Sequence, residues 1–361
     1  MKILILCDHY PLSPRVMKIR DSIMQQVHNS EVVIFCWNRK NENIMEDFIY
    51  SFNENSEYGN KKKYLFGFLH FKKNAREFIK KYSPDYIHSI DISMLLVASK
   101  LKREYKIIYE VYDIKFLRSS FVNKIRELIE VNLINKGVES IVYASPFFDI
   151  YYKKLGVHKE HTIINNKPNK LVLNLQSDYM NKYREGLKDK LVIGFVGNIR
   201  HKEILMNLIS AAAPYKDVCI LLSGDGASLK DIVQEVKLNN YNLNVVHTGR
   251  YDVKDLNSIY SCCNYIWAAY PNKNINVKYA VSNKYYESIA YKRKIIVSEK
   301  TYLSEEVILN NIGYFVNPYD REMISELILN LKKNYISDEF PDVKPTFWED
   351  DARNLCEVYT L

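Results

Sequence analysis

Cysteine is sparse in this chain and shows no metal-binding pattern. The 6 cysteines among 361 residues are scattered, without a Cys-x-x-Cys pair or a Cys/His spacing. A zinc site is therefore not expected. Cys7, Cys36 and Cys219 lie in apolar, strand-like runs. We expect them to be reduced, mostly buried thiols of a cytoplasmic protein.

Long apolar runs are also missing. No stretch of about 18 apolar residues occurs, which argues against a membrane-spanning helix. The segment MKILILCDHYPLSPR starts with an apolar run of only five or six residues, too short for a signal peptide. The chain has 11 glycines and no Gly-x-Gly-x-x-Gly motif, which disfavours a dinucleotide-dependent oxidoreductase.

The remaining composition fits a globular protein of two domains. Hydrophobic residues make up 47% and charged residues 26% of the chain, and 361 residues are too many for one ordinary core. The 51 Lys and Arg residues exceed the 43 Asp and Glu residues, which gives a net charge of +8. This mild excess suits a protein that handles phosphates or touches an anionic membrane, and no nucleic-acid partner is expected.

Short apolar runs alternate with amphipathic segments along both halves of the chain. Such alternation is typical of βαβ units and of a parallel sheet covered on both faces. The first half predicts strands at 2–7, 31–36, 86–90, 106–112, 140–144 and 161–165. The second half predicts strands at 191–197, 218–224, 243–249, 265–270, 294–298 and 314–317.

A polar segment, 165–190, separates the two series of strands. We therefore expect an α/β protein with two Rossmann-like domains, whose parallel sheets face a central cleft. The expected domains are residues 1–170 and 171–345, followed by a C-terminal helix within 346–361. Ligands of such sheets bind beyond the carboxyl ends of the strands, at helix N-termini.

Three stretches of the second half combine a strand, a glycine turn and a helix. In VIGFVGNIRHKE, Gly197 and Asn198 lead to Arg200 and Lys202, which stand where a diphosphate could rest. The alternative is a loop with solvated cations. The turns of LLSGDGASLKDI and VVHTGRYDVKDL contain Gly224, Gly226, Gly249 and Arg250. These residues either contact the ligand as well or simply form tight turns.

The stretch SNKYYESIAYKRKIIVSE (282–299) predicts a helix followed by a buried strand. Ser282 or Asn283 can cap the helix. Lys284 and Glu287 then share one face and form either a weak surface ion pair or part of a ligand site. In the second case, Lys284 would meet phosphate and Glu287 would accept hydrogen bonds from ribose hydroxyls.

Taken together, these stretches resemble the GT-B glycosyltransferases, most closely the retaining family 4 group, over nearly the whole chain. SNKYYESIAYKRKIIVSE is similar to the family pattern Pro/Ser-x-Lys-x-x-Glu-Tyr, and GFVGNIRHKE is similar to its strand–Gly–Arg–Lys segment. The resemblance implies a nucleoside-diphosphate sugar as donor and no other cofactor. It makes Arg200, Lys202 and Glu287 the candidate catalytic residues and implies that the last helix, 347–359, crosses back to the first domain.

The same resemblance points to an acceptor side in the first domain. HYPLSPRVMKIRDSI, IHSIDIS and YEVYDI are similar to family segments that line this side, which makes Arg15, His88, Asp91, Glu110 and Asp113 the candidates. The family's Glu-x7-Glu motif is half present, because Tyr279 stands eight positions before Glu287. We therefore expect the loop 271–282 to contact the sugar.

The sequence contains no Asp-x-Asp pair, which argues against a metal-dependent glycosyltransferase. The expected activity is metal-independent transfer of a sugar to a glycan or lipid-linked acceptor, as in the assembly of surface polysaccharides. A sugar-nucleotide 2-epimerase and a non-catalytic GT-B partner subunit remain alternatives. A non-catalytic subunit should show no affinity for nucleotides.

Two basic and aromatic segments suggest a contact with membranes. Residues 59–82 interleave seven Lys with six Phe or Tyr, and residues 115–128 form a second such cluster. Either they are a strand and amphipathic helices with solvated lysines, or they dock on anionic lipid. The second interpretation predicts a cytoplasmic protein that is peripheral on the inner face of the plasma membrane.

Overall fold

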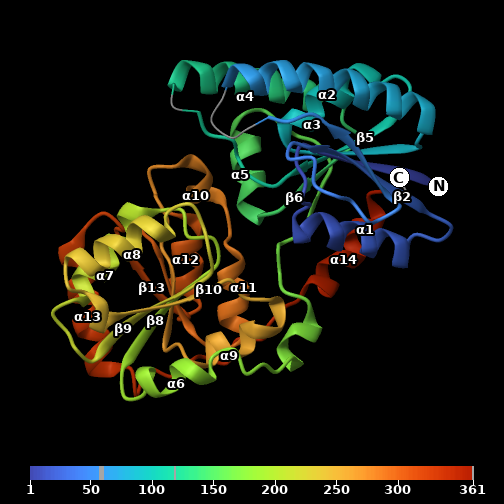
Figure 1. The fold of residues 1–361 in the computed structure, drawn as a ribbon. Helices are drawn as coiled ribbons and strands as arrows, with labels where there is room; N and C mark the ends of the chain where they lie inside the picture. Colours follow the sequence, from blue (N-terminus) through green and yellow to red (C-terminus); the bar gives the residue numbers. More distant parts are fainter. Residues whose placement is uncertain (57–60, 118, 360–361) are drawn as a thin grey trace. The chain divides into compact units, whose positions relative to one another are not determined.

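The computed structural model describes residues 1–56, 61–117 and 119–359, and the chain divides into two compact units (Figure 1). Unit 1 comprises Met1–Asn166 together with the segment from Glu349 onwards. Unit 2 comprises Lys167–Trp348. Each unit contains one parallel sheet with helices packed against it, which is the arrangement that alternating strands and helices predict.

The sheet of unit 1 has seven strands in the order β3-β2-β1-β4-β5-β6-β7, and every pairing is parallel. The side chains of β1 and β4 are buried almost without interruption, as expected for strands covered on both faces. The strands are β1 (Lys2–Cys7), β2 (Glu31–Asn38), β3 (Ile49–Asn53), β4 (Tyr86–Ile90), β5 (Lys106–Val111), β6 (Ser140–Tyr143) and β7 (His161–Ile163).

Two helices of unit 1 start at a serine cap, Ser119 or Ser145. Ser145 accepts a hydrogen bond from the Phe147 amide, and Pro146 occupies the first turn of the helix that follows, both common N-terminal features. The helices are α1 (Pro14–Gln26), α2 (Lys61–Tyr82), α3 (Asp91–Ala98), the short η1 (Ser99–Leu101), α4 (Ser120–Gly137), α5 (Pro146–Lys154) and α14 (Trp348–Glu357), which begins at the last residue of unit 2.

The sheet of unit 2 has six parallel strands in the order β10-β9-β8-β11-β12-β13. The strand order reverses next to β8, so the crevice at the carboxyl end of β8 is a topological switch point, where ligands of such sheets bind. The strands are β8 (Leu191–Val196), β9 (Val218–Ser223), β10 (Val245–Gly249), β11 (Tyr265–Ala268), β12 (Lys294–Ser298) and β13 (Gly313–Val316).

Helices cover both faces of the unit 2 sheet, with two hydrophobic clusters between helices and strands. They are η2 (Lys170–Asn174), α6 (Asn181–Leu187), α7 (Lys202–Ala212), α8 (Leu229–Leu238), η3 (Asn242–Asn244), η4 (Val253–Asp255), α9 (Leu256–Ser261), α10 (Ile275–Tyr279), α11 (Asn283–Ala290), α12 (Tyr302–Leu309) and α13 (Arg321–Asn334).

The expected fold class is confirmed, and each expected strand has a counterpart in the two sheets. The edge strand β3 was not expected, because only its first residue is fully buried and its burial does not alternate strictly. One of the two interpretations of residues 59–82, a strand followed by a helix, is wrong from residue 61 onwards, where a single helix, α2, begins. Residues 59 and 60 lie outside the described residues.

The C-terminal segment belongs to unit 1. The Asp351 carboxylate accepts hydrogen bonds from the amide and the side chain of Asn165 at 2.8 and 2.9 Å. Tyr359 is fully buried, and its hydroxyl lies 2.5 Å from His88 Nδ1. These contacts fix α14 to the first unit, as the resemblance implied. Within the described ranges, none of the helices is both long enough and apolar enough to cross a membrane.

Candidate functional site

The glycine turns of unit 2 meet at the carboxyl ends of β8, β9 and β10. Gly197, Gly224 and Gly249 have φ values of 131°, 136° and 78°, a region that glycine adopts without steric penalty. The Gly197 amide donates to the Ser223 carbonyl, and the Gly224 amide donates to the Gly249 carbonyl, both at 2.8 Å. The three turns therefore form one hydrogen-bonded surface.

Close packing between these turns requires glycine at two positions. A Cβ atom on Gly224 would lie 2.0 Å from the Gly197 carbonyl oxygen, and one on Gly226 would lie 2.4 Å from the Ile199 carbonyl oxygen and 2.6 Å from Asn198 Oδ1. Gly197 differs, because a Cβ atom there would lie 3.3 Å from the Lys284 ammonium group and, among the described residues beyond its chain neighbours, would meet no backbone atom within 4 Å. Gly224 and Gly226 thus serve the packing of the loops, while Gly197 keeps space beside a cation.

Gly224→Ala is expected to lower the free energy of unfolding by at least about 3 kcal/mol, because the new methyl group forces two backbones apart. Gly249→Ala is the matched control, since a Cβ there would meet nothing within 4 Å in the described chain. Gly249→Ala is expected to lose only about 1–2 kcal/mol, because alanine is unfavourable at the positive φ of this residue. Urea denaturation of both variants measures the difference, and equal losses would contradict the packing explanation.

Lys284 is a buried cation in the first turn of α11. The Ser282 hydroxyl caps this helix by accepting from the Lys284 amide at 3.4 Å, and Asn283 is exposed beside it. The Lys284 side chain is 7% exposed, and its Nζ donates to Tyr270 Oη at 2.7 Å and lies 4.6 Å from the centroid of the Phe195 ring. No carboxylate in the described part of the chain forms an ion pair with it. A buried charge of this kind is unfavourable until an anion joins it.

Further positive charge surrounds the Tyr270 hydroxyl. Burial would raise the pKa of Tyr270, but the Lys284 ammonium, the hydrogen bonds with Lys284 and Ser282, and the Arg200 guanidinium together outweigh it and lower this pKa. The His201 ring packs edge-on against Tyr270, with 5.9 Å between centroids. Burial, with Arg200 and Lys284 nearby, lowers the pKa of His201. The surroundings of the Tyr270 hydroxyl therefore favour negative charge.

Glu287 lies one turn after Lys284 in α11 but is not paired with it. Its Oε2 accepts a hydrogen bond from Tyr260 Oη at 2.5 Å. Burial first, and then the Glu287 charge, raise the pKa values of Tyr251, Tyr260 and Tyr291. Across the described residues, the carboxylate forms no ion pair, and it remains partly exposed. The surface ion pair that the spacing allowed is thus wrong, and Glu287 keeps acceptor capacity for a ligand.

The other expected cations differ in their surroundings. Arg200 is exposed. Lys202 begins α7, and its Nζ lies 2.8 Å from Glu235 Oε2. Arg250 Nε lies 2.8 Å from Asp225 Oδ2, and both of these side chains are exposed. Exposed ion pairs contribute little to stability, so Lys202 and Arg250 can exchange these partners for a phosphate.

Tyr270 and His201 complete the site and were not expected. His201 stands between two residues that were singled out, Arg200 and Lys202, so its position was a usable signal. Tyr270 is one of 29 tyrosines, and nothing in its sequence context separates it from those of the core. Within the loop 271–282, Tyr279 ends α10 and is buried, with its ring centroid 5.1 Å from that of Tyr302.

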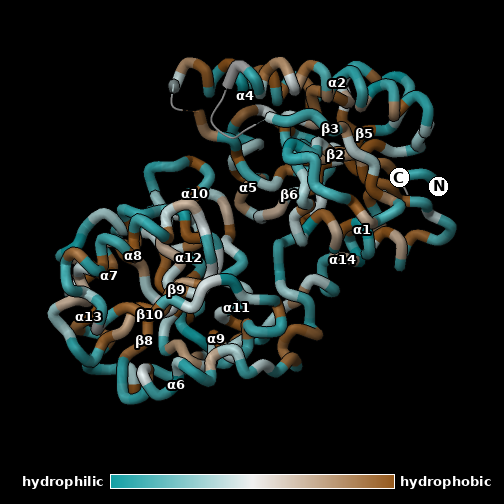
Figure 2. The backbone as a smooth tube through the Cα atoms, in the orientation of Figure 1, coloured by the Kyte–Doolittle hydropathy of each residue, from teal (hydrophilic) through white to brown (hydrophobic). Residues whose placement is uncertain are grey.

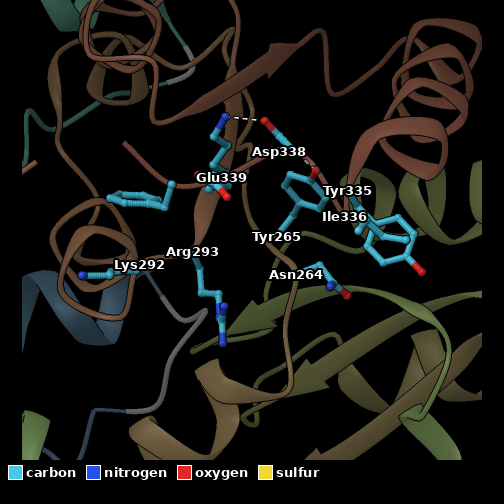
Figure 3. A pocket seen from close by; sticks show the side chains of 10 residues that line it. Asn264, Tyr265, Lys292, Arg293, Tyr335, Ile336, Asp338 and Glu339 are labelled. Atoms are coloured by element: carbon cyan, nitrogen blue, oxygen red, sulfur yellow. Dashed lines mark hydrogen bonds and ion pairs between the residues drawn. The ribbon is translucent and has the colours of Figure 1, made fainter. Parts of the chain in front are cut away.

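A pocket of about 210 Å³ lies at the opposite edge of the unit 2 sheet (Figure 3). Its lining comes from the first residues of β11 and β12, from the residues just before them and from the segment after α13. Asp338 pairs there with Lys294 and accepts hydrogen bonds from Tyr265 Oη at 2.7 Å and Tyr314 Oη at 2.8 Å. The Asp338 charge is thus satisfied within the protein, and ligands of parallel sheets bind at the carboxyl ends of strands, so this pocket is not the candidate site.

In unit 1, three of the expected acceptor-side residues form a closed network. Arg15 Nε donates to Glu110 Oε1 at 2.8 Å, and His88 Nε2 lies 2.6 Å from Glu110 Oε2. All three side chains are 3% exposed or less. Burial opposes ionisation of Glu110, yet Arg15 and His88 hold its pKa below the ordinary value. We therefore assign Arg15, His88 and Glu110 a structural role in joining α1, β4, β5 and, through Tyr359, the C-terminal segment.

Asp91 and Asp113 follow β4 and β5 at the carboxyl edge of the unit 1 sheet. Asp91 has a φ of 58°, a strained backbone that is common at functional sites. Its Oδ1 accepts from the Tyr112 amide at 3.0 Å and the Asp113 amide at 3.5 Å, and its Oδ2 lies 2.6 Å from Lys115 Nζ. Burial raises the pKa of Asp91 to about 6, although Lys115 and the Tyr112 amide oppose this rise.

Asp8 and His9, directly after β1, extend this polar cluster and were not expected. Ser93 Oγ donates to Asp8 Oδ2 at 3.3 Å, and His9 Nδ1 lies 3.0 Å from Asp8 Oδ1. Burial opposes the charge on Lys115, but Asp91 and then Asp8 raise its pKa. The position of both residues at the end of the first apolar run is the signal that could have found them.

Comparisons with solved structures agree with this architecture. Sucrose-phosphate synthase from Thermosynechococcus elongatus aligns with a TM-score of 0.73 and 15% identity, over 99% of this chain and 94% of that chain. Anabaena Alr3699/HepE in complex with UDP-glucose aligns with a TM-score of 0.69 and 14% identity, over 100% and 96%. The lipopolysaccharide outer core galactosyltransferase WaaB aligns with a TM-score of 0.61 and 16% identity, over 99% and 95%.

No family model matches the chain, and no curated protein matches it by sequence. At these low identities, the structural likeness concerns the fold alone. Both sheets are parallel and covered by helices, and the alignments span nearly all of each chain. The chain therefore has the two-domain GT-B fold of glycosyltransferases.

Proposed function

We propose that this protein transfers a sugar from a nucleoside-diphosphate donor to a hydroxyl group of a glycan or a lipid-linked acceptor. The observation that carries the proposal is Lys284, a buried ammonium group without an ion-pair partner among the described residues. It stands beside the Gly197 turn and shares its surroundings with Arg200 and His201. A diphosphate supplies the missing negative charge. The likeness to HepE, which was solved with UDP-glucose, supports this choice of donor.

The cations have a direct role in the proposed reaction. When the bond between the sugar and the phosphate oxygen breaks, negative charge develops on the leaving diphosphate. Lys284 stabilises this charge from a fixed position, Arg200 adds a second positive charge, and Lys202 joins them by releasing Glu235. Glu287 accepts hydrogen bonds from the ribose hydroxyls. In this proposal, side chains rather than a metal ion neutralise the leaving group.

On the acceptor side, we propose that Asp91 holds the attacking hydroxyl. A new bond forms between the sugar and the acceptor oxygen, and the proton of that hydroxyl passes to the leaving phosphate oxygen. The resemblance to retaining enzymes supports transfer with the anomeric configuration kept. Asp91 suits this role because it is the expected acceptor-side carboxylate with a strained backbone and a raised pKa.

We further propose that the acceptor belongs to surface polysaccharide assembly and that the reaction takes place in the cytoplasm at a membrane surface. The likeness to WaaB, a lipopolysaccharide outer core galactosyltransferase, supports this setting. A lipid-linked acceptor would confine the reaction to the bilayer. A free glycan acceptor would leave the chemistry at the donor site unchanged.

Nucleotide binding tests the proposal. One class among UDP-, GDP- and dTDP-sugars is expected to raise the melting temperature, by the equivalent of about 2.7 kcal/mol at one hundred times its dissociation constant. Glu287→Gln is expected to weaken this binding about 10- to 100-fold, because it replaces charge-assisted hydrogen bonds to the ribose. Isothermal titration of both proteins measures the effect.

Glu326→Gln is the matched control, because Glu326 is an exposed carboxylate on α13. It is expected to bind the nucleotide like the unmodified protein. An unchanged affinity in Glu287→Gln would remove Glu287 from the site. No stabilisation by any nucleotide at millimolar concentration would overturn the proposed function and favour a non-catalytic subunit.

A further inference from the structure

Helix α4 presents apolar side chains to solvent and charged ones to the protein. Its buried positions are Arg126, Glu130 and Ile134. An ordinary surface helix has the opposite arrangement, with apolar residues facing the core. The spacing of the exposed residues places them along one stripe of the helix. They are 41–74% exposed: Phe121, Val122, Ile125, Leu128 and Ile129.

The charged face of α4 is held in place by a buried polar network. Arg126 pairs with Glu130, and Glu130 Oε1 accepts from Tyr109 Oη at 2.5 Å and from Tyr152 Oη at 2.6 Å. Arg126 also donates to Tyr151 Oη at 3.1 Å. Turning the apolar stripe inward would break this network and leave charges unpaired, which is strongly unfavourable. The stripe therefore stays exposed unless something outside the chain covers it.

Further apolar side chains are exposed just before α4 and on α2. Phe116 and Leu117 lie just before α4, and Leu65, Phe66 and Leu69 are exposed in the first half of α2. Both α2 and α4 pack against α3, and Figure 2 shows hydrophobic residues along both helices. We call these five residues and the stripe of α4 the apolar face. Grouped exposed side chains of this size mark an interaction surface, unlike single ones.

A basic groove of about 440 Å³ lies along α2 and reaches the apolar face at Leu69. Burial first, and then the charges of Arg76 and Lys100, lower the pKa of Lys72, which shows how closely the cations of the groove are crowded. Helix α2 as a whole carries eight Lys and Arg residues but only one acid, Glu77. The cations that line the groove are Lys72, Lys73, Arg76, Lys80 and Lys100.

We propose that the apolar face and the basic groove together dock this protein on an anionic lipid bilayer. The apolar side chains enter the boundary between the headgroups and the acyl chains, and the groove receives the phosphate groups of anionic lipids. A surface with large apolar side chains next to clustered lysines is typical of interfacial helices.

The charge pattern favours a lipid surface over the other possible occupants. A second copy of this chain, paired through the same face, would bring the cations that line its groove close to their equivalents, and like charges in contact are unfavourable. A free phosphate would occupy the groove but would leave the apolar face exposed to water. An anionic bilayer satisfies both parts, because it offers negative charge beside an apolar interior.

The inference rests on side chains of unit 1 and does not depend on the proposed reaction, although it specifies the membrane surface proposed for it. Vesicle binding can be measured without a sugar nucleotide. If the protein binds vesicles but no nucleotide, the docking surface stands and the donor site fails. If it binds a nucleotide but no vesicles, the donor site stands and the docking surface fails.

The test is co-sedimentation of the full-length protein with vesicles. Vesicles of phosphatidylcholine with roughly a third phosphatidylglycerol are expected to bind at least about 10-fold more tightly than phosphatidylcholine alone, because each Lys or Arg near an anionic surface contributes about 1 kcal/mol. The variant Phe121→Ser, Ile125→Ser, Leu128→Ser is expected to lose at least about 10-fold of this affinity. The variant Lys73→Gln, Lys80→Gln, Lys100→Gln is expected to lose the preference for phosphatidylglycerol and the sensitivity to salt.

A matched control carries serine at three exposed apolar positions outside the apolar face, Leu238, Leu309 and Ile336, which are 74%, 81% and 86% exposed. It is expected to bind vesicles like the unmodified protein. All variants should keep their circular dichroism spectrum and melting temperature, because the changed side chains are exposed.

Four results would overturn the docking proposal. The first is the absence of vesicle binding, and the second is equal binding by the α4 variant and its control. The third is a concentration-dependent dimer that the α4 substitutions abolish, which would assign the face to a second copy. Competition by 10 mM inorganic phosphate, roughly ten times a millimolar affinity, is expected to leave vesicle binding in place. Complete displacement by phosphate would show that the groove binds free anions instead of a bilayer.

Discussion

Lys284→Met is expected to abolish sugar transfer while leaving the protein at least as stable as before. Removing one fixed charge that stabilises a developing anion lowers the rate about 10²- to 10³-fold in enzymes. The affinity for the nucleotide should fall as well, because Lys284 stands beside the Gly197 turn where the diphosphate is proposed to lie. Release of the nucleoside diphosphate and isothermal titration measure the two losses separately.

The expected stability of this variant follows from the surroundings of the ammonium group. Lys284 is 7% exposed and is bonded to a hydroxyl group rather than to a carboxylate. Methionine keeps most of the length of the side chain and its contact with the Phe195 ring but has no charge to desolvate. Replacing an uncompensated buried charge by an apolar side chain is neutral or stabilising. Activity and stability are thus expected to move in opposite directions.

Lys294→Met is the matched control for this prediction. Lys294 is a second buried lysine of unit 2, 6% exposed, but it is ion-paired with Asp338. Its replacement leaves the partly buried Asp338 carboxylate without its ion-pair partner, and the free energy of unfolding should fall by about 3 kcal/mol. Nucleotide affinity should not change. If Lys284→Met lost stability like Lys294→Met and still bound the nucleotide, the Lys284 ammonium would be structural and the proposed function would lose its main support.

The sequence was sufficient for the fold because local patterns and global architecture agree in this chain. Apolar runs of four to seven residues, separated by amphipathic segments, mark buried parallel strands without knowledge of their partners. Strand β3 escaped this pattern because an edge strand is only half buried. The inverted helix α4 could not be predicted either. Its apolar stripe has the spacing of a core-facing helix.

The buried face of α4 was decided by contacts distant in sequence. Tyr109 in β5 and Tyr152 in α5 supply the hydroxyl groups that satisfy Glu130. The same limit explains the acceptor side. A histidine and a glutamate in apolar strands can line a site or pair with each other, and only the structure shows that His88 and Glu110 are paired. Lys284 and Glu287 could be named as candidates from the sequence, because both lie near the start of a helix that follows a strand and its loop.

Asp91→Asn and Glu110→Gln are expected to change stability in opposite ways. The folded protein holds Asp91 at a pKa of about 6, above an unfolded value of about 3.9. Its contribution to stability is therefore fully present below about pH 4 and is lost as the pH rises through 6. The amide side chain that replaces the carboxylate does not ionise. Relative to the unmodified protein, Asp91→Asn should gain about 3 kcal/mol of unfolding free energy between pH 4 and 7.5.

The contribution of Glu110 to stability depends on pH in the opposite direction. Arg15 and His88 hold its pKa below the ordinary value, so its contribution is present above the unfolded pKa and is lost as the pH falls through the folded one. Glu110→Gln removes the carboxylate from a buried pair and should lower the free energy of unfolding by about 3–5 kcal/mol at pH 7. Urea denaturation of both variants between pH 4 and 7.5 gives the two difference curves.

Activity separates a functional Asp91 from a structural one. The ionised carboxylate is the form that accepts a hydrogen bond from the acceptor hydroxyl, so the rate should rise as the pH passes about 6. Asp91→Asn should then lose about 100-fold in kcat, flatten this rise and keep its nucleotide affinity. An unchanged rate, or a rise that persists in Asp91→Asn, would exclude the role. The group would then lower stability at neutral pH for no gain in activity, whereas a lost rise would show that the ionised Asp91 carboxylate is retained for catalysis although it lowers stability.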